Sequence, residues 1–410
     1  MKPDTTDLLV ENLPAAQTHL RIAVVTETYP PEINGVALTL QRVVLGLRER
    51  GHDVQLVRPR QGGDVRPDSK DGDVLLRGMA IPRYPHLQLG LPSRRQLEPL
   101  WTLQRPDLVH IATEGPLGWS ALRVARKLRI PVTSDFRTNF HAYSSHYGMG
   151  WLSKPIMAYL RRFHNQTLTT MVPTRGLADR LGQAGFERLQ VVARGVDTAL
   201  FDAARRDDTL RERWGAGPDT PVLLCVGRLA REKNLPLLVR AYAQARLVQP
   251  DLKLVLVGDG PLRAELQTLA PDAILTGQLD RMELARHYAS ADIFGFPSQT
   301  ETFGNVVLEA MASGLAVLAY DYAAASENIT PGSTGLLAAL DDEEAFVRQL
   351  ADLAQNAGLR ERLRAAAREA ARQNDWAGIV AQIESVMKLA IAGHINSGGQ
   401  PLSVPAQQVA

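Results

Sequence analysis

The chain has 410 residues, more than one hydrophobic core usually serves, and this length predicts two domains. Its 46 Lys and Arg residues against 44 Asp and Glu residues leave a formal net charge of +2, which does not support a nucleic-acid partner. The single cysteine, Cys225, lies in the apolar run Val222–Val226 without a disulfide partner, so a buried strand position and a reducing, cytoplasmic setting are expected.

The N-terminal half of the chain alternates short apolar runs with helical patterns, which is typical of a parallel β-sheet covered by helices. Before it, residues 1–19 carry Asp4, Asp7 and Glu11 and lack the continuous apolar core of a secretory signal. The predicted strands are Arg21–Thr26, Asp53–Arg58, Asp107–Ala112, Pro131–Asp135 and Thr170–Val172, and the predicted helices are Val36–Arg50 and Trp151–Thr169.

The C-terminal half repeats this alternation and ends in helices. The predicted strands are Pro221–Gly227, Leu252–Gly258 and Asp292–Phe296, and the predicted helices are Leu235–Leu247, Glu343–Asn356, Leu359–Gln373 and Trp376–Ala392. No stretch approaches the roughly 20 consecutive apolar residues of a membrane-spanning helix, so any membrane contact is expected to be peripheral.

These patterns predict an α/β protein with two Rossmann-like, doubly wound domains. The predicted boundaries are an N-terminal extension over 1–19, a first domain over 20–200, a second domain over 201–375, a C-terminal helix over 376–392 and a disordered tail over 393–410. The charge-rich segment Asp197–Pro218 is predicted to be the linker. Because such sheets bind ligands at the carboxyl ends of their strands, two facing domains place a cleft at the strand-to-helix loops.

The first loop of interest follows the first predicted strand. It runs from Thr26 to Val36 and has Gly35 at the start of the next helix, where a glycine lets backbone amides meet a phosphate. A plain turn explains this segment equally well, because a single glycine is a weak signal.

The second loop carries two cations. Arg228 and Lys233 lie between the strand Pro221–Gly227 and the helix that follows it, so both point toward the cleft. Arginine offers a planar fork and lysine a compact charge, a pair suited to neutralising a diphosphate. A solvated basic loop is the alternative interpretation.

The third loop is the most informative part of the sequence, because Glu301 and Glu309 stand eight positions apart around a predicted helix start. Gly304 marks a place where the backbone can come close to a ligand, and the apolar residues after it predict a helix packed into a core. The amides at the start of a helix attract an anion such as a diphosphate, while the carboxylates accept hydrogen bonds from sugar hydroxyls. This layout indicates a nucleotide-sugar pocket.

Together, Gly227-Arg228-Leu229 with Lys233-Asn234 and the segment from Glu301 to Glu309 resemble the retaining glycosyltransferases of the GT-B fold in glycosyltransferase group 1. The resemblance runs over roughly residues 20 to 390, and the class includes bacterial mannosyltransferases and glycolipid-forming glucosyl- and sulfoquinovosyltransferases. It implies a hexosyltransferase that moves a mannose- or glucose-type hexose from a GDP- or UDP-linked donor to a lipid or glycan hydroxyl. The sequence leaves the base, the sugar, the acceptor and the oligomeric state open.

The resemblance also implies a role for each matching residue. Arg228 and Lys233 would grip the donor diphosphate, Glu309 would hold the ribose hydroxyls, and Glu301 would touch the transferred sugar. The other expected donor-binding residues are Gly35, which would face the phosphates from the first domain, Gly227, the base-pocket segment Thr276, Gly277, Gln278 and Leu279, and the amides of Phe303, Gly304 and Asn305. These cations and amides would stand in for a metal, so neither a metal nor a cofactor is expected.

Metal-dependent sugar transferases of the other common fold use an Asp-x-Asp pair, and this chain contains Asp71-Gly72-Asp73. A hydrophilic turn explains that triplet better, because it ends the polar stretch from Gln61 to Asp73. The first domain shows no clear carboxylate nucleophile, since Glu27, Glu32 and Glu114 are only loosely placed. A same-face, retaining mechanism is therefore what the resemblance implies.

The acceptor side, in the first domain, departs from the family pattern at Arg137. The segment Thr133–Gly148 resembles a loop in which relatives often have Phe-His-Thr, and Arg137 stands at the histidine position. Arg137 can still donate a hydrogen bond to the donor sugar but cannot serve as a neutral base. His141 is the nearest replacement, followed by His110 and His146, although each also fits a hydrogen-bonded structural residue.

The segment Trp151–Phe163 is the only indication of how an acceptor is recognised. It mixes aromatic and aliphatic residues with Lys154, Arg161 and Arg162. Such a helix can lie on an anionic membrane, which fits a lipid acceptor and an enzyme on the cytoplasmic face. The same pattern fits a domain-packing helix with a basic face.

Proteins of other classes are the alternatives. A dinucleotide-binding oxidoreductase would need a third glycine after Gly258-Asp259-Gly260, at the place where Arg263 stands, so that fingerprint is incomplete. A nucleotide-sugar epimerase or a non-catalytic nucleotide-sugar-binding protein fits the same scaffold. The sequence shows no paired acid and base for epimerisation, and a nucleotide-release assay separates a binding protein from a transferase.

Overall fold

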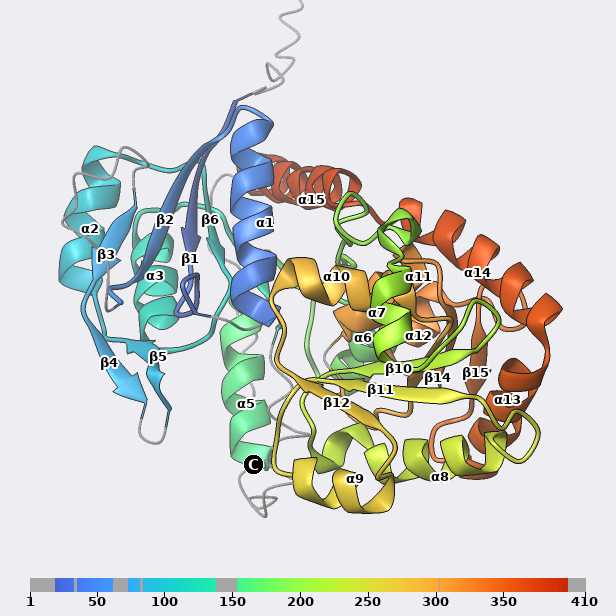
Figure 1. The fold of residues 1–410 in the computed structure, drawn as a ribbon. Helices are drawn as coiled ribbons and strands as arrows, with labels where there is room; N and C mark the ends of the chain where they lie inside the picture. Colours follow the sequence, from blue (N-terminus) through green and yellow to red (C-terminus); the bar gives the residue numbers. More distant parts are fainter. Residues whose placement is uncertain are drawn as a thin grey trace, which may run out of the picture.

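The computed structural model describes residues 19–32, 35–61, 73–81, 84–137, 153–301 and 303–396. In this part of the chain two α/β domains lie side by side, each built around its own parallel sheet (Figure 1). The predicted fold class is therefore confirmed.

The first domain is organised around strand β1. Within the described residues its sheet has the order β3-β2-β1-β6-β7-β8-β9. Val24 of β1 pairs in parallel with Leu56 of β2 on one side and with His110 of β6 on the other. The direction in which successive strands are added reverses between β1 and β6, so the loops after these strands diverge at one edge of the sheet. The strands are β1 Arg21–Val25, β2 Asp53–Pro59, β3 Val74–Leu76, β6 Leu108–Ile111, β7 Val132–Asp135, β8 Thr169–Val172 and β9 Leu189–Val191, and β4 Gly78–Ile81 and β5 Tyr84–Gly90 form a separate antiparallel ribbon.

The second domain repeats this plan around strand β10. Within the described residues its sheet has the order β12-β11-β10-β13-β14-β15. Leu224 of β10 pairs with Val255 of β11 and with Phe294 of β13, so the reversal falls between β10 and β13. The strands are β10 Val222–Val226, β11 Lys253–Val257, β12 Ile274–Gly277, β13 Ile293–Phe296, β14 Ala316–Tyr320 and β15 Leu336–Ala338.

Helices cover both sheets. The first domain has α1 Gly35–Glu49, α2 Arg94–Leu103, α3 Pro116–Lys127, α5 Ser153–His164 and α6 Arg175–Gln183. The second has η2 Ala203–Arg205, α7 Asp208–Arg213, η3 Arg231–Lys233, α8 Leu235–Ala245, α9 Arg263–Leu269, α10 Arg281–Ser290, α11 Asn305–Ala312, α12 Ala323–Asn328, α13 Glu343–Gln355 and α14 Ala357–Arg372.

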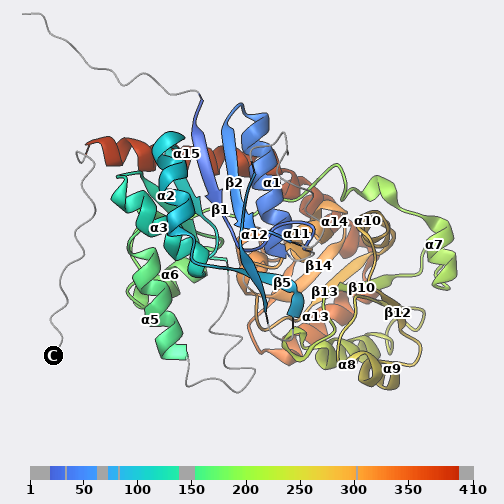
Figure 2. The same ribbon diagram turned by 90° about the vertical axis from the view of Figure 1, so that its left-hand side faces the viewer.

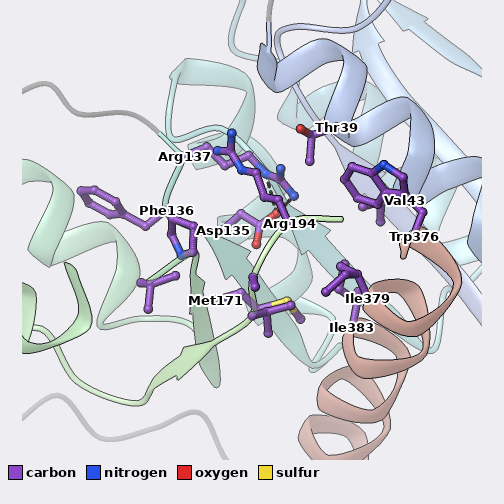
Figure 3. A pocket seen from close by; sticks show the side chains of 14 residues that line it. Thr39, Val43, Asp135, Phe136, Arg137, Met171, Arg194, Trp376, Ile379 and Ile383 are labelled. Atoms are coloured by element: carbon purple, nitrogen blue, oxygen red, sulfur yellow. Dashed lines mark hydrogen bonds and ion pairs between the residues drawn. The ribbon is translucent and has the colours of Figure 1, made fainter. Parts of the chain in front are cut away.

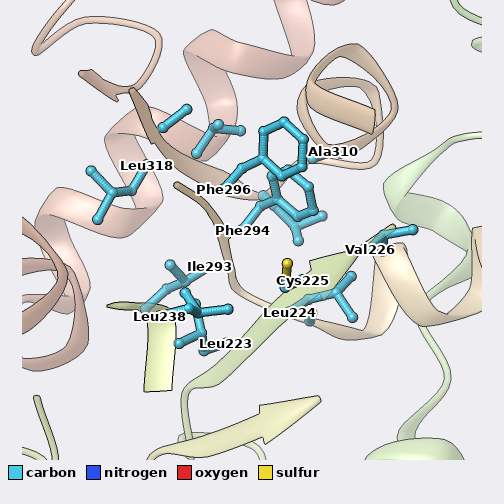
Figure 4. Packing of buried hydrophobic residues seen from close by; sticks show 14 of the residues in the cluster. Leu223, Leu224, Cys225, Val226, Leu238, Ile293, Phe294, Phe296, Ala310 and Leu318 are labelled. Atoms are coloured by element: carbon cyan, nitrogen blue, oxygen red, sulfur yellow. The ribbon is translucent and has the colours of Figure 1, made fainter. Parts of the chain in front are cut away.

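The core of the second domain explains why β10 is apolar throughout. All five of its residues are buried, because the sheet carries helices on both faces. Cys225 packs among Leu224, Phe294 and their neighbours (Figure 4), as the sequence predicted for a buried strand position. Burial raises the pKa of the Cys225 thiol to about 12.

The chain crosses between the domains twice, and the two crossings are paired. Val196 forms a parallel bridge with Asp375, and its amide donates to the Asn374 carbonyl at 2.9 Å. After the second crossing, α15 (Trp376–Asn396) returns to the first domain and packs against α1 (Figures 1 and 2). Val380 and Met387 are buried there in the same cluster as β1, so the last helix completes the core of the first domain.

Several predicted boundaries were wrong. Helix α5 ends at His164 and not at Thr169, because the Thr167 hydroxyl donates to the His164 carbonyl at 2.8 Å and turns the chain into β8. Helix α15 continues to Asn396, beyond the predicted Ala392 and into the segment predicted as disordered. It is also long and apolar enough to cross a membrane by length and composition alone, which the sequence analysis overlooked.

The segment predicted as a linker, Asp197–Pro218, is instead folded onto the second domain. Leu210 and Trp214 lie in the hydrophobic core of the second domain, and Arg211 is buried. The Arg211 guanidinium binds Asp292 at 2.9 Å and the carbonyls of Ser290, Gly217 and Thr220 at 2.7 to 2.8 Å. The positive charge of Arg211, which belongs to the charge-rich stretch that indicated a linker, is therefore paired and hydrogen-bonded inside the second domain.

Candidate functional site

The carboxyl ends of β10 and β13 hold the residues that the sequence singled out in the second domain. The loop after β10 begins at Gly227 and packs backbone to backbone on the loop after β11. A Cβ atom at Gly258, where φ is +129°, would lie 2.0 Å from the Gly227 carbonyl oxygen, so the close approach requires glycine. The Gln299 amide donates to the Glu232 carbonyl at 3.1 Å, which ties the loop after β13 to the loop after β10.

Lys233 and Glu301 meet between these two loops. Their side chains form an ion pair and are 17% and 15% exposed. The Ser298 hydroxyl donates to the same Glu301 oxygen, Oε1, at 2.9 Å, and the Lys233 ammonium lies 5.4 Å from the centre of the Phe296 ring. Both charges therefore have fixed positions at the reversal point of the sheet, where doubly wound domains bind ligands.

Arg228 lies on the same loop as Lys233 but does not join that ion pair. It pairs with Glu232, and its side chain is 45% exposed. The structure thus places one predicted cation in a half-buried position beside Glu301 and leaves the other near the surface.

Helix α11 begins directly after Gly304, as the sequence predicted. Gly304 has φ +95° and precedes Asn305, the first helical residue. A Cβ at Gly304 would lie 3.5 Å from the Glu301 side chain, so the helix start and the Lys233–Glu301 pair are neighbours. Phe303 is buried, and the Asn305 side-chain oxygen has no hydrogen-bond partner within the described residues. In the first turn of α11 the Val307 amide donates to the Gly304 carbonyl at 3.1 Å, while the amides of Asn305 and Val306 have no partner inside the helix and lie beside fixed charges.

Glu309 lies one turn into α11 and is held by Tyr288. The Tyr288 hydroxyl donates to Glu309 Oε2 at 3.1 Å. Burial raises the pKa of Glu309 to about 7, against the opposing effects of the Tyr288 hydrogen bond and the Arg281 charge. Near neutral pH this carboxyl therefore exchanges a proton readily.

The predicted base-pocket segment consists of the last two residues of β12, Thr276 and Gly277, and the two residues after it. Thr276 donates to the Gly277 carbonyl at 3.0 Å, and the Gly258 amide donates to the same carbonyl at 2.9 Å. Gln278 is exposed, and Leu279 is half-buried against the core of the second domain. Reading of a base by this segment stays a prediction.

In the first domain, Arg137 is bound to Asp135. Arg137 Nε donates to Asp135 Oδ2 at 2.6 Å (Figure 3), and His110 Nε2 lies 3.2 Å from the same oxygen. Burial alone would raise the pKa of Asp135, but the charges of Arg137 and His110 outweigh it and hold the pKa below its usual range. His110 is buried and also contacts Thr133 at 3.0 Å, so it is a structural residue. His141 and His146 lie outside the described residues.

Gly35 begins α1, and no heavy atom of the described residues lies within 4 Å of a Cβ placed on it. Among the described residues there is therefore room for a ligand at the start of α1, but this room does not by itself show that a ligand binds there. Of the Asp-Gly-Asp triplet only Asp73 is described, and it pairs with Arg48 at 3.4 Å. No group of three or more metal-ligating side chains occurs in the described ranges.

The acidic residues after β1 and β6 have structural partners. Glu27 accepts from the Leu117 amide at 3.0 Å and caps the start of α3. Burial raises the pKa of Glu27 to about 7. Glu32 accepts from the Gln61 amide at 2.9 Å, and Glu114 lies 3.5 Å from His164.

Sequence reasoning missed Arg194, which lies just before the first crossing between the domains. Its side chain is buried (Figure 3), and its guanidinium carbon is 5.6 Å from the centre of the Phe303 ring. The only signal in the sequence is an arginine inside the otherwise apolar run from Val191 to Val196.

Known proteins match this arrangement of domains. The family described as "Glycosyl transferases group 1" matches residues 206–370, and "Glycosyltransferase Family 4" matches residues 33–200. The chain is 36% identical over 334 residues to the GDP-mannose-dependent alpha-mannosyltransferase of Mycolicibacterium smegmatis, which covers 79% of this chain and 86% of the relative. It is 32% identical to the sulfoquinovosyl transferase SQD2 of Arabidopsis thaliana, over 89% of this chain and 72% of the relative.

Among solved structures, HepE from Anabaena in complex with UDP superposes with a TM-score of 0.72 at 18% identity. The match covers 90% of this chain and all of HepE. Sucrose-phosphate synthase from Thermosynechococcus elongatus superposes with a TM-score of 0.71 at 19% identity, over 91% of this chain. The protein therefore belongs to the glycosyl transferases group 1 and is a glycosyltransferase of the GT-B fold.

Proposed function

We propose that this glycosyltransferase moves mannose from GDP-mannose to a hydroxyl of a lipid or glycolipid, with retention of the anomeric configuration and without a metal. The donor is supported by relatives named GDP-mannose-dependent alpha-mannosyltransferase, which are 36%, 35% and 31% identical to this chain. Relatives named alpha-monoglucosyldiacylglycerol synthase and phosphatidylinositol monomannoside mannosyltransferase support a lipid or glycolipid acceptor.

The observation that carries the proposal is the Lys233–Glu301 ion pair beside the start of α11. A donor diphosphate placed against this pair meets the ammonium of Lys233 and the free amides of the helix. Glu301 then exchanges part of its contact with Lys233 for hydrogen bonds from sugar hydroxyls. Glu309, with Tyr288 on one oxygen, accepts ribose hydroxyls with the other.

In the reaction, the bond between the anomeric carbon and the β-phosphate oxygen breaks, and its electron pair goes to the phosphate. The acceptor oxygen forms the new bond on the same face, and its proton passes to the departing phosphate oxygen. The negative charge grows where Lys233 and the α11 amides are already in place, so these groups stabilise the transition state more than the ground state. Arg228 reaches the same diphosphate from the open side of the loop.

Retention through a same-face step is supported by the carboxylates of the first domain. A covalent intermediate would need a carboxylate free to attack the anomeric carbon. Glu27 caps α3 through Leu117, Glu32 is engaged by Gln61, and Glu114 faces His164. These three residues therefore have other roles.

We place the reaction at the cytoplasmic face of a membrane, with α5 as the contact surface. Leu160 and Phe163 are buried and anchor the helix, while Lys154, Arg161 and Arg162 are exposed. A basic exposed face on an anchored helix binds an anionic surface, and this would bring a lipid hydroxyl to the cleft.

A nucleotide-release assay on the full chain tests the proposal. GDP-mannose and UDP-glucose are supplied separately with dioleoylglycerol in phosphatidylglycerol vesicles or with octyl α-mannoside, each with and without EDTA. We expect acceptor-dependent release of GDP from GDP-mannose that EDTA does not reduce. Release of UDP alone would overturn the donor assignment, and loss of turnover in EDTA would overturn metal independence.

A further inference from the structure

We infer that Arg194 is a further donor-binding residue, which binds a phosphate oxygen of the nucleotide sugar from the crossing between the two domains. This inference rests on the proposed nucleotide-diphosphate donor, and it concerns a residue outside the strand-end loops that carry the other donor contacts.

The position of Arg194 is fixed by the paired crossings. Val196, two residues later, bridges to Asp375. A Cβ at Gly195 would lie 2.9 to 3.0 Å from atoms of Trp376, so the chain is tightly packed at this point. Arg194 therefore lies three residues after the end of β9, in a tightly packed segment between that strand and the bridge at Val196.

From this segment the Arg194 side chain reaches Phe303 in the second domain. Arg194 is 8% exposed, and its guanidinium carbon lies 5.6 Å from the centre of the Phe303 ring. Phe303 immediately precedes Gly304 and the start of α11. The guanidinium thus lies against the residue that comes two positions before the first residue of α11.

The charged groups around Arg194 leave it without an anion. Asp135 is bound by Arg137 and His110, and Glu301 is bound by Lys233 and Ser298. Within the described residues Arg194 itself forms no ion pair and no side-chain hydrogen bond, and its guanidinium lies over the Phe303 ring. Burial, followed by the neighbouring charge of Arg137, lowers the pKa of Arg194 to about 9.

Arg211, the other deeply buried arginine of interest, has the partners that Arg194 lacks. Arg211 is equally buried, but it is satisfied by Asp292 at 2.9 Å and by carbonyls at 2.7 to 2.8 Å. A buried guanidinium without such partners is strongly unfavourable, and a phosphate, which accepts two parallel hydrogen bonds from arginine, would relieve the cost.

The small cavity beside Arg194 cannot hold the anion. The cavity lined by Thr39, Arg137, Arg194 and Trp376 has a volume of about 20 Å³, which holds about one water molecule (Figure 3). One water can hydrate part of the guanidinium there, but a phosphate does not fit. We place the phosphate instead on the side of the guanidinium that faces Phe303, next to the start of α11.

The test compares Arg194→Met and Arg194→Lys with Arg180→Met. Arg180 is a matched control, because its guanidinium also lies over an aromatic ring of the other domain, at 5.5 Å from Tyr322, but on the surface. The affinities of GDP and guanosine are measured by calorimetry, together with the melting temperature of each ligand-free protein.

We expect Arg194→Met to weaken GDP binding by about 10- to 100-fold, as the loss of hydrogen bonds between charged groups implies, with guanosine binding unchanged. Arg194→Lys should recover part of the loss, and Arg180→Met should bind GDP as the wild type does. The ligand-free Arg194→Met protein should melt no lower than the wild type, because an uncompensated buried charge has been removed.

Wild-type GDP affinity in Arg194→Met would overturn the inference, and so would equal weakening of GDP and guanosine. If the wild type prefers UDP, the proposed donor is wrong and UDP with uridine replaces the GDP pair, so Arg194 is still tested. If the wild type binds no nucleoside diphosphate, the inference and the proposed function both fail.

Discussion

Lys233 and Glu301 form a half-buried ion pair that joins the loops after the two central strands of the second sheet, directly in front of the start of α11. Such a pair is a weak source of stability, because both charges lose hydration when they are buried. Its value lies in holding an ammonium and a carboxylate at set positions where a diphosphate and a sugar can replace part of the contact.

Replacing Lys233 tests that role. Lys233→Met should lower kcat/KM for GDP-mannose by about 10²- to 10³-fold, the usual effect of removing a group that stabilises developing charge. Lys127→Met is the control, since Lys127 also pairs with a glutamate, Glu98, but is 58% exposed on the first domain. The measurement is the steady-state kinetics of both variants. Near-normal turnover in Lys233→Met would show that Lys233 does not belong to the active site.

The raised pKa of Glu309 makes stability depend on pH. The folded chain holds a proton on Glu309 up to about pH 7, whereas an ordinary glutamate loses it near 4.5. Between these values the folded state binds more protons than the unfolded state, so this residue makes the free energy of unfolding fall as pH rises, by about 3 kcal/mol in all.

Glu309→Gln should therefore lack this fall. Urea unfolding from pH 5 to pH 8 measures the free energy of unfolding of both proteins. As pH rises, this free energy should fall more in the wild type than in Glu309→Gln. Glu27, whose pKa is also about 7, is present in both proteins and cancels. Parallel pH profiles would mean that the pKa of Glu309 is not raised by burial.

At Gly35, an effect on protein stability can be distinguished from an effect on ligand binding. A Cβ there meets no described heavy atom within 4 Å, so Gly35→Ala should melt as the wild type does. If a phosphate approaches the start of α1, the added methyl group should raise the KM for GDP-mannose several-fold. An unchanged KM would leave Gly35 as an ordinary helix start.

Asp292 holds the folded segment that precedes β10. Besides Arg211, it binds Arg206 at 3.1 Å and the Val222 amide at 3.0 Å. Asp292→Ala leaves Arg211 buried and unpaired, which should reduce the free energy of unfolding by about 3–5 kcal/mol. Arg240→Ala, which breaks an exposed pair with Glu343, should change it by at most about 1 kcal/mol. Equal losses in urea unfolding of the two variants would contradict this assignment.

The sequence predicted the parts of the molecule that depend on local patterns. The apolar strand Val222–Val226 and the helix start after Gly304 are both found, since burial on both faces and a glycine at a helix start leave local signatures. The alternation of apolar runs and helical patterns in both halves indicated the fold class, and these two features directed attention to the strand-end loops.

What the sequence did not reveal depends on partners far away along the chain. Arg211 and its partner Asp292 are 81 positions apart, so the segment around Arg211 looked like a charged linker. Arg194 has no local motif, and its significance comes from Phe303 and from the paired crossing at Asp375. Tertiary contacts of this kind cannot be read from composition or periodicity.

The most direct test of the central claim is the anomeric configuration of the product formed from GDP-mannose. The full chain is incubated with GDP-mannose and octyl α-mannoside in EDTA, and the product is examined by NMR through its one-bond carbon–hydrogen coupling at the anomeric position. The account predicts an α-mannoside, which forms together with GDP and forms about 10²- to 10³-fold more slowly with Lys233→Met. A β-mannoside, or a product from UDP-glucose but none from GDP-mannose, would contradict it.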